Sequence, residues 1–277
     1  MNNNPPLTII SAEPESPIAY CKKLWQYRAM ILAIARRDWK AKYAQTLVGI
    51  LWSVLQPLIG LLIFTFFFEK VVRISDKVPY SYAVFAFSGM TCWYYFTQHL
   101  HQGGTALVQE QALLKKIYFP RLLLPISKAV SGLADYTISL LLLFLLLVWK
   151  GIYPGPHLLF LPFFIILNII TALSVSIWLS ALTIRYRDFH HLIPYLVSFG
   201  IWLTPVFYPV TLVPEAYQFL LYCNPMAVVI EGFRWSLIGD VAYFDIRYFI
   251  GIAISFTLLL SGLVYFFKIE YQIIDFI

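Results

Sequence analysis

Six long apolar stretches, separated by short basic or proline-rich connections, constrain this chain more than any other feature. They fall at residues 46–68, 80–104, 122–149, 157–184, 192–210 and 247–267. A helix needs roughly 20 predominantly apolar residues to cross a hydrocarbon core of about 30 Å, and these stretches match or approach that length. Because backbone polar groups inside lipid must be satisfied within the span, we predict an all-α polytopic membrane protein with six transmembrane helices.

The composition agrees with this fold class. The chain is 60% hydrophobic and 12% charged, whereas an ordinary soluble domain has roughly 25% charged residues. The formal net charge of +6 needs no nucleic acid, since anionic lipid headgroups are the expected counterpart. The three cysteines are scattered without ligand spacing, and we predict neither a disulfide framework nor a metal site.

The N-terminal region divides into two parts. Residues 1–19 are polar and proline-rich and lack the basic start and apolar core of a signal peptide, so we expect a disordered, uncleaved cytoplasmic tail. Residues 20–45 place apolar side chains at helical spacing with basic residues on other faces. This pattern predicts an amphipathic helix lying in the membrane surface, with packing on a soluble partner as the alternative. Residues 46–277 form the transmembrane domain.

The distribution of basic residues predicts the orientation. Fourteen of the 20 Lys and Arg residues fall before the first span, around the second and fourth connections, or in the C-terminal tail. Cytoplasmic segments carry such an excess, so both termini are predicted in the cytoplasm.

The region between the fifth and sixth spans is apolar, but prolines cut it into short pieces. Residues 216–223 and 226–238 are each too short to cross, and the Asn224-Pro225 dipeptide favours a turn between them. We predict a re-entrant helical hairpin on the non-cytoplasmic side, lining a pathway or buried by protein. A folded external loop resting on the bundle is the alternative.

Catalytic motifs are absent from the sequence. The chain has no Gly-Lys pair and hence no P-loop, and it has neither a His-Glu-x-x-His motif nor a Gly-x-Ser-x-Gly elbow. Two charged sets fall in apolar segments: Lys128 with Asp135, and Glu231 with Arg234. Intramembrane charges are functional candidates, but each set can also neutralise itself, and we favour structural pairing over a proton relay.

An ordered set of motifs over residues 20–277 resembles the ABC-2-type permeases of polysaccharide exporters. A basic Arg-Asp stretch at 37–43 leads into Leu-Val-Gly-Ile-Leu-Trp at 47–52 and Gln-Pro at 56–57. The later motifs are Leu-Lys-Lys at 114–116, Phe-Pro-Arg at 119–121, Arg-Tyr-Arg-Asp at 185–188, Thr-Pro-Val-Phe-Tyr-Pro at 204–209, Asn-Pro-Met at 224–226, Arg234, and a looser match at Glu270 and 275–277.

The resemblance implies a transport subunit rather than an enzyme. Two copies would form a homodimer with two copies of a separate ABC ATPase, which would bind ATP and Mg while this chain holds no cofactor. The cargo would be a lipid-linked polysaccharide such as O-antigen or teichoic acid, moved across the cytoplasmic (inner) membrane. The resemblance also implies that the segment 106–120 is a coupling helix against the ATPase, with the 185–191 turn nearby.

These expectations give three sets of candidate residues. The substrate-channel candidates, chosen as aromatic residues of spans one, two and five, are Trp52, Tyr94, Tyr95, Tyr195 and Trp202. The candidates for contact with the lipid phosphate are Arg36, Arg37 and Lys40. The candidates for coupling to the ATPase are Glu110, Lys115, Lys116, Arg185, Arg187 and Asp188. No catalytic residue and no metal ligand is predicted.

Other functions remain open at this stage. One alternative is an ABC-2 exporter with the same subunits that moves a drug or a small lipid instead of a polysaccharide. A membrane-embedded glycosyl- or acyltransferase would need a cluster of catalytic carboxylates or histidines, which the sequence does not provide. A secondary transporter would follow a proton gradient rather than ATP.

Overall fold

The computed structural model describes residues 17–74, 78, 80–239, 247–270 and 272–273, and within them the chain is helical with no strand. The prediction of an all-α fold is therefore confirmed for this part. The helices are α1 (Pro17–Gln26), α2 (Arg28–Tyr43), α3 (Trp52–Thr65), α4 (Tyr82–Gly104), α5 (Ala106–Gln109), α6 (Gln111–Leu114), α7 (Leu123–Trp149), α8 (Leu161–Arg185), α9 (Asp188–Leu203), α10 (Glu215–Cys223), α11 (Pro225–Ile238) and α12 (Tyr248–Glu270). Shorter 3-10 or π turns are η1 (Gly49–Leu51), η2 (Phe66–Val71), η4 (Pro156–Phe160) and η5 (Val210–Leu212).

Four helical stretches among the described residues are long and apolar enough to cross a membrane. They run over Gly49–Val71, Leu123–Trp149, Pro156–Arg185 and Tyr248–Glu270. They coincide with the first, third, fourth and sixth predicted spans. The turns η1 and η2 extend α3, and η4 extends α8, so each stretch reaches spanning length.

The second and fifth predicted spans, 80–104 and 192–210, are not among the helices that are both long and apolar enough to cross a membrane. α4 has 23 residues but is less apolar, since its C-terminal part holds Gln98, His99 and His101. α9 has 16 residues, because the backbone turns extended at Thr204, ahead of Pro205. At 1.5 Å per residue such a helix covers about 24 Å, which is less than a hydrocarbon core.

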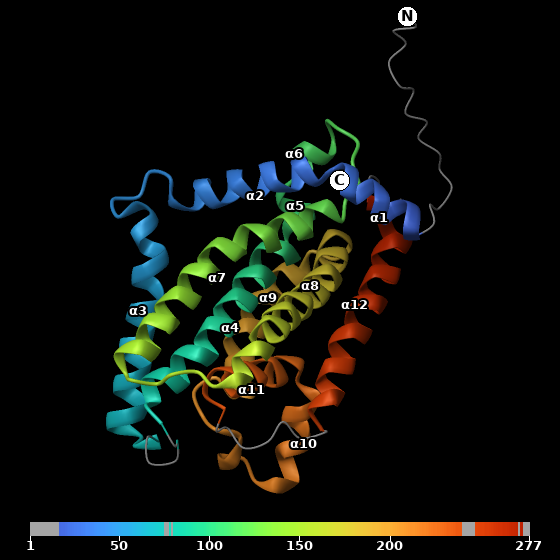
Figure 1. Cartoon of the computed structure of the whole chain (residues 1–277). Helices are drawn as coiled ribbons and strands as arrows, with labels where there is room; N and C mark the ends of the chain where they lie inside the picture. The colour runs from blue at the N-terminus through green and yellow to red at the C-terminus, as the bar shows by residue number, and fades with distance from the viewer. Residues whose placement is uncertain (1–16, 75–77, 79, 240–246, 271, 274–277) are drawn as a thin grey trace, which may run out of the picture.

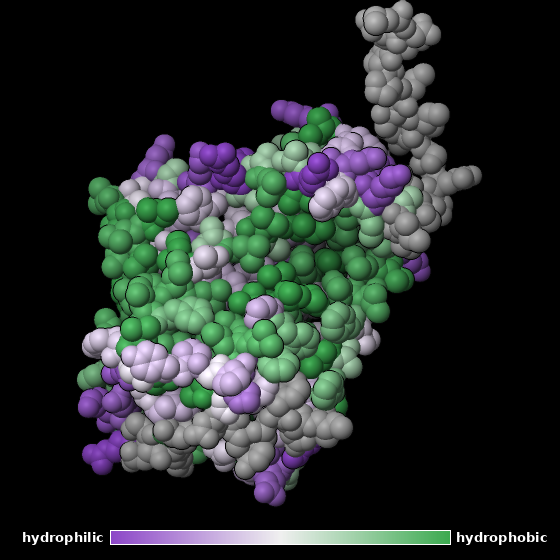
Figure 2. All heavy atoms as spheres, in the orientation of Figure 1, coloured by the Kyte–Doolittle hydropathy of each residue, from purple (hydrophilic) through white to green (hydrophobic). Residues whose placement is uncertain are grey.

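The bundle is organised around α4, which packs against α3, α7, α8 and α11, while α8 packs against α12. α2 lies across one end, on α7, and α10 and α11 lie at the other end (Figure 1). A broad apolar band covers the visible face between these ends, and hydrophilic residues gather over α1 and α2 (Figure 2). This distribution is that of a bundle surrounded by lipid with two hydrated ends.

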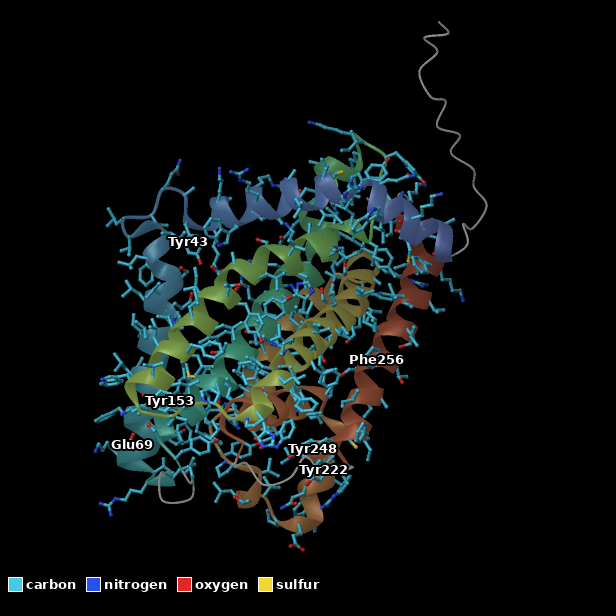
Figure 3. The ribbon with its side chains drawn as sticks, in the orientation of Figure 1. Tyr43, Glu69, Tyr153, Tyr222, Tyr248 and Phe256 are labelled. Atoms are coloured by element: carbon cyan, nitrogen blue, oxygen red, sulfur yellow. The ribbon has the colours of Figure 1, made fainter. Side chains whose placement is uncertain are left out.

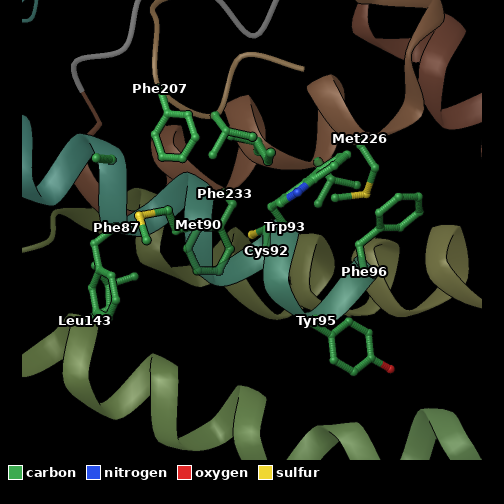
Figure 4. Packing of buried hydrophobic residues seen from close by; sticks show 14 of the residues in the cluster. Phe87, Met90, Cys92, Trp93, Tyr95, Phe96, Leu143, Phe207, Met226 and Phe233 are labelled. Carbon is green, nitrogen blue, oxygen red and sulfur yellow. The ribbon is translucent and has the colours of Figure 1, made fainter. Parts of the chain in front are cut away.

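Aromatic side chains of α4 form the middle of the larger apolar core (Figure 4). Phe87, Trp93 and Tyr95 are buried there together with Phe207, from the loop after α9, and Phe233 from α11. A second apolar cluster lies at the α2 end and joins residues of α5, α7, α8 and α12. Apolar packing thus fixes the hairpin to α4 at one end and the short helices to the bundle at the other.

The hairpin helices predicted at 216–223 and 226–238 are present as α10 and α11. Asn224 caps α11, because its side chain accepts a hydrogen bond from the Met226 backbone N–H at 3.0 Å. The Asn224 amide also donates to the Leu203 carbonyl at 3.2 Å and to Thr204 Oγ1 at 2.9 Å. One side chain therefore ties the turn of the hairpin to the end of α9.

The predicted helix at 20–45 is divided in two, because the chain bends at Tyr27 between α1 and α2. Residues 17–19, which we expected in the disordered tail, begin α1; the rest of that tail, 1–16, and the C-terminal motif at 275–277 lie outside the described residues. The Tyr20 hydroxyl donates to Glu270 Oε1 at 2.8 Å, and the Arg121 backbone N–H donates to the same oxygen at 2.8 Å. α1 and the end of α12 therefore meet at the same end of the bundle.

The segment predicted as a continuous coupling helix at 106–120 is also broken. It forms only the single turns α5 and α6, because Glu110 between them leaves the helical conformation with φ −102° and ψ 23°. The Glu110 side chain turns toward α7, which explains the break (see below). Lys115 and Lys116 follow α6 and are exposed.

Candidate functional site

A chain of ion pairs joins α2, the α5–α6 junction and α7 at the α2 end of the bundle. Lys128 on α7 is only 6% exposed, and its Nζ lies 2.7 Å from Asp38 Oδ2 and 3.1 Å from Glu110 Oε1. Arg37 pairs with the same Glu110 carboxylate and, at 2.8 Å, with Asp38. The hydrogen bond to Glu110 is the main cause that raises the pKa of Arg37. Two cations thus match two carboxylates where a lone buried charge would be costly.

A second cluster surrounds Asp135, further along α7. Its Oδ1 accepts hydrogen bonds from Tyr43 OH at 2.7 Å and Trp39 Nε1 at 3.2 Å. Its Oδ2 accepts from Lys42 Nζ at 2.7 Å and Gln98 Nε2 at 3.2 Å. Four donors match the acceptor capacity of a carboxylate. Tyr43 lies where α2 ends above α3 and α7 (Figure 3), so this cluster fixes the C-terminal end of α2 to the bundle.

The prediction that Lys128 and Asp135 neutralise each other is wrong. Seven residues of helix separate their Cα atoms by about 10 Å along the axis, too far for a direct ion pair. Each residue instead pairs with α2: Lys128 with Asp38, and Asp135 with Lys42. The helix across the end of the bundle supplies the counter-charges.

The pairing of Glu231 with Arg234 is confirmed, at 2.8 Å. Arg234 is fully buried, and its guanidinium also donates to the carbonyls of Phe85 (3.1 Å), Pro205 (2.6 Å) and Val206 (2.6 Å). This one side chain therefore joins α11 to α4 and to the loop after α9.

A polar cavity of about 340 Å³ lies beside the Asp135 cluster, between α2, α3, α4, α7 and α9. Most of its lining residues carry amides or hydroxyls, and the Lys42–Asp135 ion pair and one imidazole complete its polar lining. Gln56, Tyr94, Gln98, His101, Gln102 and Ser139 are among the lining residues. Hydroxyl and amide groups beside an aromatic ring are a set of partners suited to sugar hydroxyls.

The structure does not bring the five channel candidates together within one chain. Tyr94 lines the polar cavity. Tyr95 is buried, with its hydroxyl 3.3 Å from the Ala129 carbonyl and its ring 4.8 Å from that of Tyr136. Trp52, Tyr195 and Trp202 are instead 42%, 62% and 59% exposed, so they belong to the outer surface of α3 and α9.

The charged candidates also fall into two groups. Arg36, Lys40, Lys115, Lys116, Arg185, Arg187 and Asp188 are exposed. Glu110, by contrast, has a side chain only 13% exposed and is bound to Lys128. Arg37 is half-exposed and bound to Glu110 and Asp38.

Sequence reasoning missed Asp38, Trp39, Lys42, Tyr43 and Gln98 as members of these clusters. A signal was available for the α2 residues. Asp38 and Lys42, like Trp39 and Tyr43, are four residues apart, so each pair lies on one side of α2. Lys128 and Asp135, both in the third predicted span, needed partners of this kind.

The fold and its charged clusters define a multi-helix integral membrane protein with a polar cavity at one end. Among the described residues, no group of three or more His, Cys, Asp or Glu side chains is placed to hold a metal ion. A family model described as ABC-2 type transporter matches residues 30–238. The chain belongs to this family.

Curated relatives carry the comparison further. The chain is 28% identical over 219 residues to the O-antigen export system permease protein RfbA of Myxococcus xanthus, covering 78% of this chain and 83% of that protein. It is 26% identical over 247 residues to an O-antigen export system permease protein RfbA of Klebsiella pneumoniae, covering 88% of this chain and 93% of that protein. The resemblance to ABC-2 permeases expected from the motifs is therefore confirmed.

Proposed function

We propose that this chain is the permease subunit of an ATP-driven exporter that moves a lipid-linked, O-antigen-like polysaccharide across the cytoplasmic membrane. The observation that carries the proposal is the match to O-antigen export permeases over most of both chains. The polar cavity of amides, hydroxyls and a tyrosine supports a glycan as cargo. ATP and Mg bind to the partner ATPase, and this chain holds neither.

The proposed topology has six crossings with both termini in the cytoplasm of the inner membrane. α4 and α9 add to the four clearly apolar stretches. The polar groups of α4 are tolerated in lipid because neighbouring helices surround that helix. α10 and α11 form the re-entrant hairpin from the opposite side. The exposed basic residues at the α2 end agree with a cytoplasmic position for that end.

The proposed assembly is a homodimer that pairs the outer surfaces of α3 and α9. Both helices expose large apolar side chains, including Leu62 on α3 and Phe199 on α9, at 70% and 65%. Trp52, Tyr195 and Trp202 are exposed on these same helices. Two facing copies would place these aromatics around a shared path, where their flat rings suit sliding contact with sugars.

Two copies of an ABC ATPase would bind at the α2 end. Lys115, Lys116, Arg185, Arg187 and Asp188 are exposed for direct contact. Glu110 acts differently in this proposal, because its side chain binds Lys128 and Arg37 within the protein. It transmits movement of the α5–α6 segment to α2 and α7.

Arg36 and Lys40 are exposed on α2 at the same end, where the lipid phosphates of a cargo would meet the membrane surface. Arg37 is less available for this contact, because its guanidinium already forms ion pairs with Glu110 and Asp38. Arg36 and Lys40 are therefore the stronger candidates of the three for a first electrostatic attraction of the substrate.

The test is surface display in a cell that makes the lipid-linked polymer but lacks its own exporter. We expect polymer on intact cells, detected by antibody, only when this permease and its cognate ATPase are both produced. A control ATPase with a substituted P-loop lysine should abolish display. Export of a drug with no effect on the polymer, or sugar or acyl transfer by the permease alone, would contradict the proposal.

A further inference from the structure

A second cavity, of about 360 Å³, lies where the α5–α6 segment meets the ends of α8 and α9. Its lining includes Val108 and Gln111 from the short helices, Thr183 from the last turns of α8, and Arg187, His190 and His191 at the start of α9. No aspartate or glutamate lines it. Beside the apolar Val108 and Ile184, the lining therefore offers side chains that can donate hydrogen bonds and one fixed positive charge.

Thr183 gives independent reason to expect a ligand. This residue is only 1% exposed, and within the described part of the chain its Oγ1 has no hydrogen-bond partner. A buried hydroxyl normally finds a partner, because leaving one unpaired is energetically costly. A group inside the cavity that accepts a hydrogen bond would satisfy it.

The N-terminus of α9 adds an electrostatic attraction for anions. α9 has 16 residues, and Arg187 stands at its N-cap position beside the cavity. The N-terminus of a helix carries partial positive charge and attracts anions, and phosphate is a common occupant of such places. His190 and His191 follow within the first turn, with ring centroids 5.8 Å apart. Asp188 is close in sequence but does not line the cavity.

We propose that this cavity binds a phosphate group of the lipid-linked substrate. The inference rests on the proposed function, since it names a contact for that substrate. The cavity lies at the end of the Pro156–Arg185 stretch, one of the four that can cross a membrane, so it sits at the level of lipid headgroups. A guanidinium, two imidazoles and a buried hydroxyl match the several acceptor oxygens of a phosphate.

The position of the cavity would link phosphate binding to the α5–α6 segment. A phosphate held by Arg187 and Thr183 would be able to contact the α5–α6 segment through Gln111, which also lines the cavity. That segment joins the exposed Lys115 and Lys116 to the partly buried Glu110. The substrate's phosphate would therefore bridge α9 and the segment that we propose to contact the ATPase.

The test measures equilibrium binding of a radiolabelled polyprenyl diphosphate to the purified full-length permease in phosphatidylcholine nanodiscs. Arg187→Gln should weaken binding about tenfold, the loss expected when one charge-assisted contact is removed. Thr183→Val should weaken binding by about threefold to tenfold, whereas Thr183→Ser, which keeps the hydroxyl, should bind nearly as well as the wild type. Thermal unfolding without ligand checks that each variant is folded.

The matched control is Arg28→Gln, which removes the same charge from an exposed arginine at the α2 end that does not line the cavity. We expect its affinity to stay within about twofold of the wild type. Equal losses for Arg28→Gln and Arg187→Gln, or no loss for Arg187→Gln and Thr183→Val, would overturn the site. Inorganic diphosphate binding as tightly, with the same dependence on the variants, would overturn its assignment to a lipid substrate. Surface display with the ATPase tests the transport function separately, so failure of the site leaves that result unchanged.

Discussion

The Lys128 ammonium on α7 lies 2.7 Å from the Asp38 carboxylate on α2. This contact, with Glu110 on the other side of the lysine, links the helix across the end of the bundle to a membrane-spanning helix and to the α5–α6 segment. In an exporter driven by a separate ATPase, movement of the bound ATPase subunit has to be transmitted to the membrane-spanning helices. The Lys128 cluster is a rigid connection suited to that purpose.

Replacing Lys128 by Met should strongly destabilise the protein. The change leaves Asp38 and Glu110 in a buried position with only Arg37 as cation, and removal of one partner of a buried ion pair costs on the order of 3 kcal/mol. Chemical unfolding in detergent measures the loss. The exposed Lys116→Met is the control and should change stability by less than about 0.5 kcal/mol. Equal stability of the two variants would show that Lys128 does not hold the cluster.

Charge reversal should distinguish residues that contact the ATPase from the residue that joins the α5–α6 segment to α2 and α7. Lys115→Glu with Lys116→Glu changes exposed residues, so the folded permease should keep its stability but lose stimulation of the ATPase. Glu110→Lys instead puts a third cation beside Lys128 and Arg37, and should lower both the unfolding midpoint and the stimulation of the ATPase. ATP hydrolysis by the reconstituted complex is the readout. Full stimulation in the double variant would exclude these lysines from the ATPase contact.

Arg234 should be intolerant of substitution. Arg234→Met leaves the carbonyls of Phe85, Pro205 and Val206 and the Glu231 carboxylate without their donor, at a cost of about 3–5 kcal/mol. Arg234→Lys keeps the charge but cannot reach all of these acceptors, so its loss should be smaller yet clear. Yield and thermal midpoint in detergent measure the effect. A wild-type midpoint for Arg234→Met would contradict this assignment.

The stabilisation that the Tyr43 hydroxyl gives the folded protein should depend on pH. Burial raises the pKa of the Tyr43 hydroxyl, and the hydrogen bond to Asp135 adds to the shift. The unfolded chain loses this proton near pH 10, whereas the folded protein keeps it, so the stabilisation is complete below about pH 10 and is lost as the pH rises. The midpoint difference between wild type and Tyr43→Phe should therefore narrow from about pH 8 to about pH 11. A constant difference would show that folding does not raise the pKa of the Tyr43 hydroxyl.

Much of this architecture is predictable from local sequence patterns. Apolar length identifies the four clear spans, and the Asn224-Pro225 dipeptide identifies the turn between α10 and α11, because both signals are contained within one segment. The pairing of Glu231 with Arg234 was also predictable, since residues three apart on a helix are neighbours.

The remaining features depend on contacts between distant segments. Lys128 and Asp135 find their partners on α2, about 90 residues away, and no pattern within α7 specifies them. The break at Glu110 has the same origin, since an inward contact to Lys128 competes with a continuous helix. The second cavity is likewise made by three segments, although Arg187, His190 and His191 are close together in the sequence.

The decisive measurement is transport into sealed proteoliposomes that contain this permease with or without its ATPase. We expect ATP-dependent movement of a lipid-linked polysaccharide across the bilayer when both subunits are present, and neither movement nor nucleotide hydrolysis by the permease alone. Movement driven by a proton gradient without the ATPase, or ATP hydrolysis by the isolated permease, would contradict it.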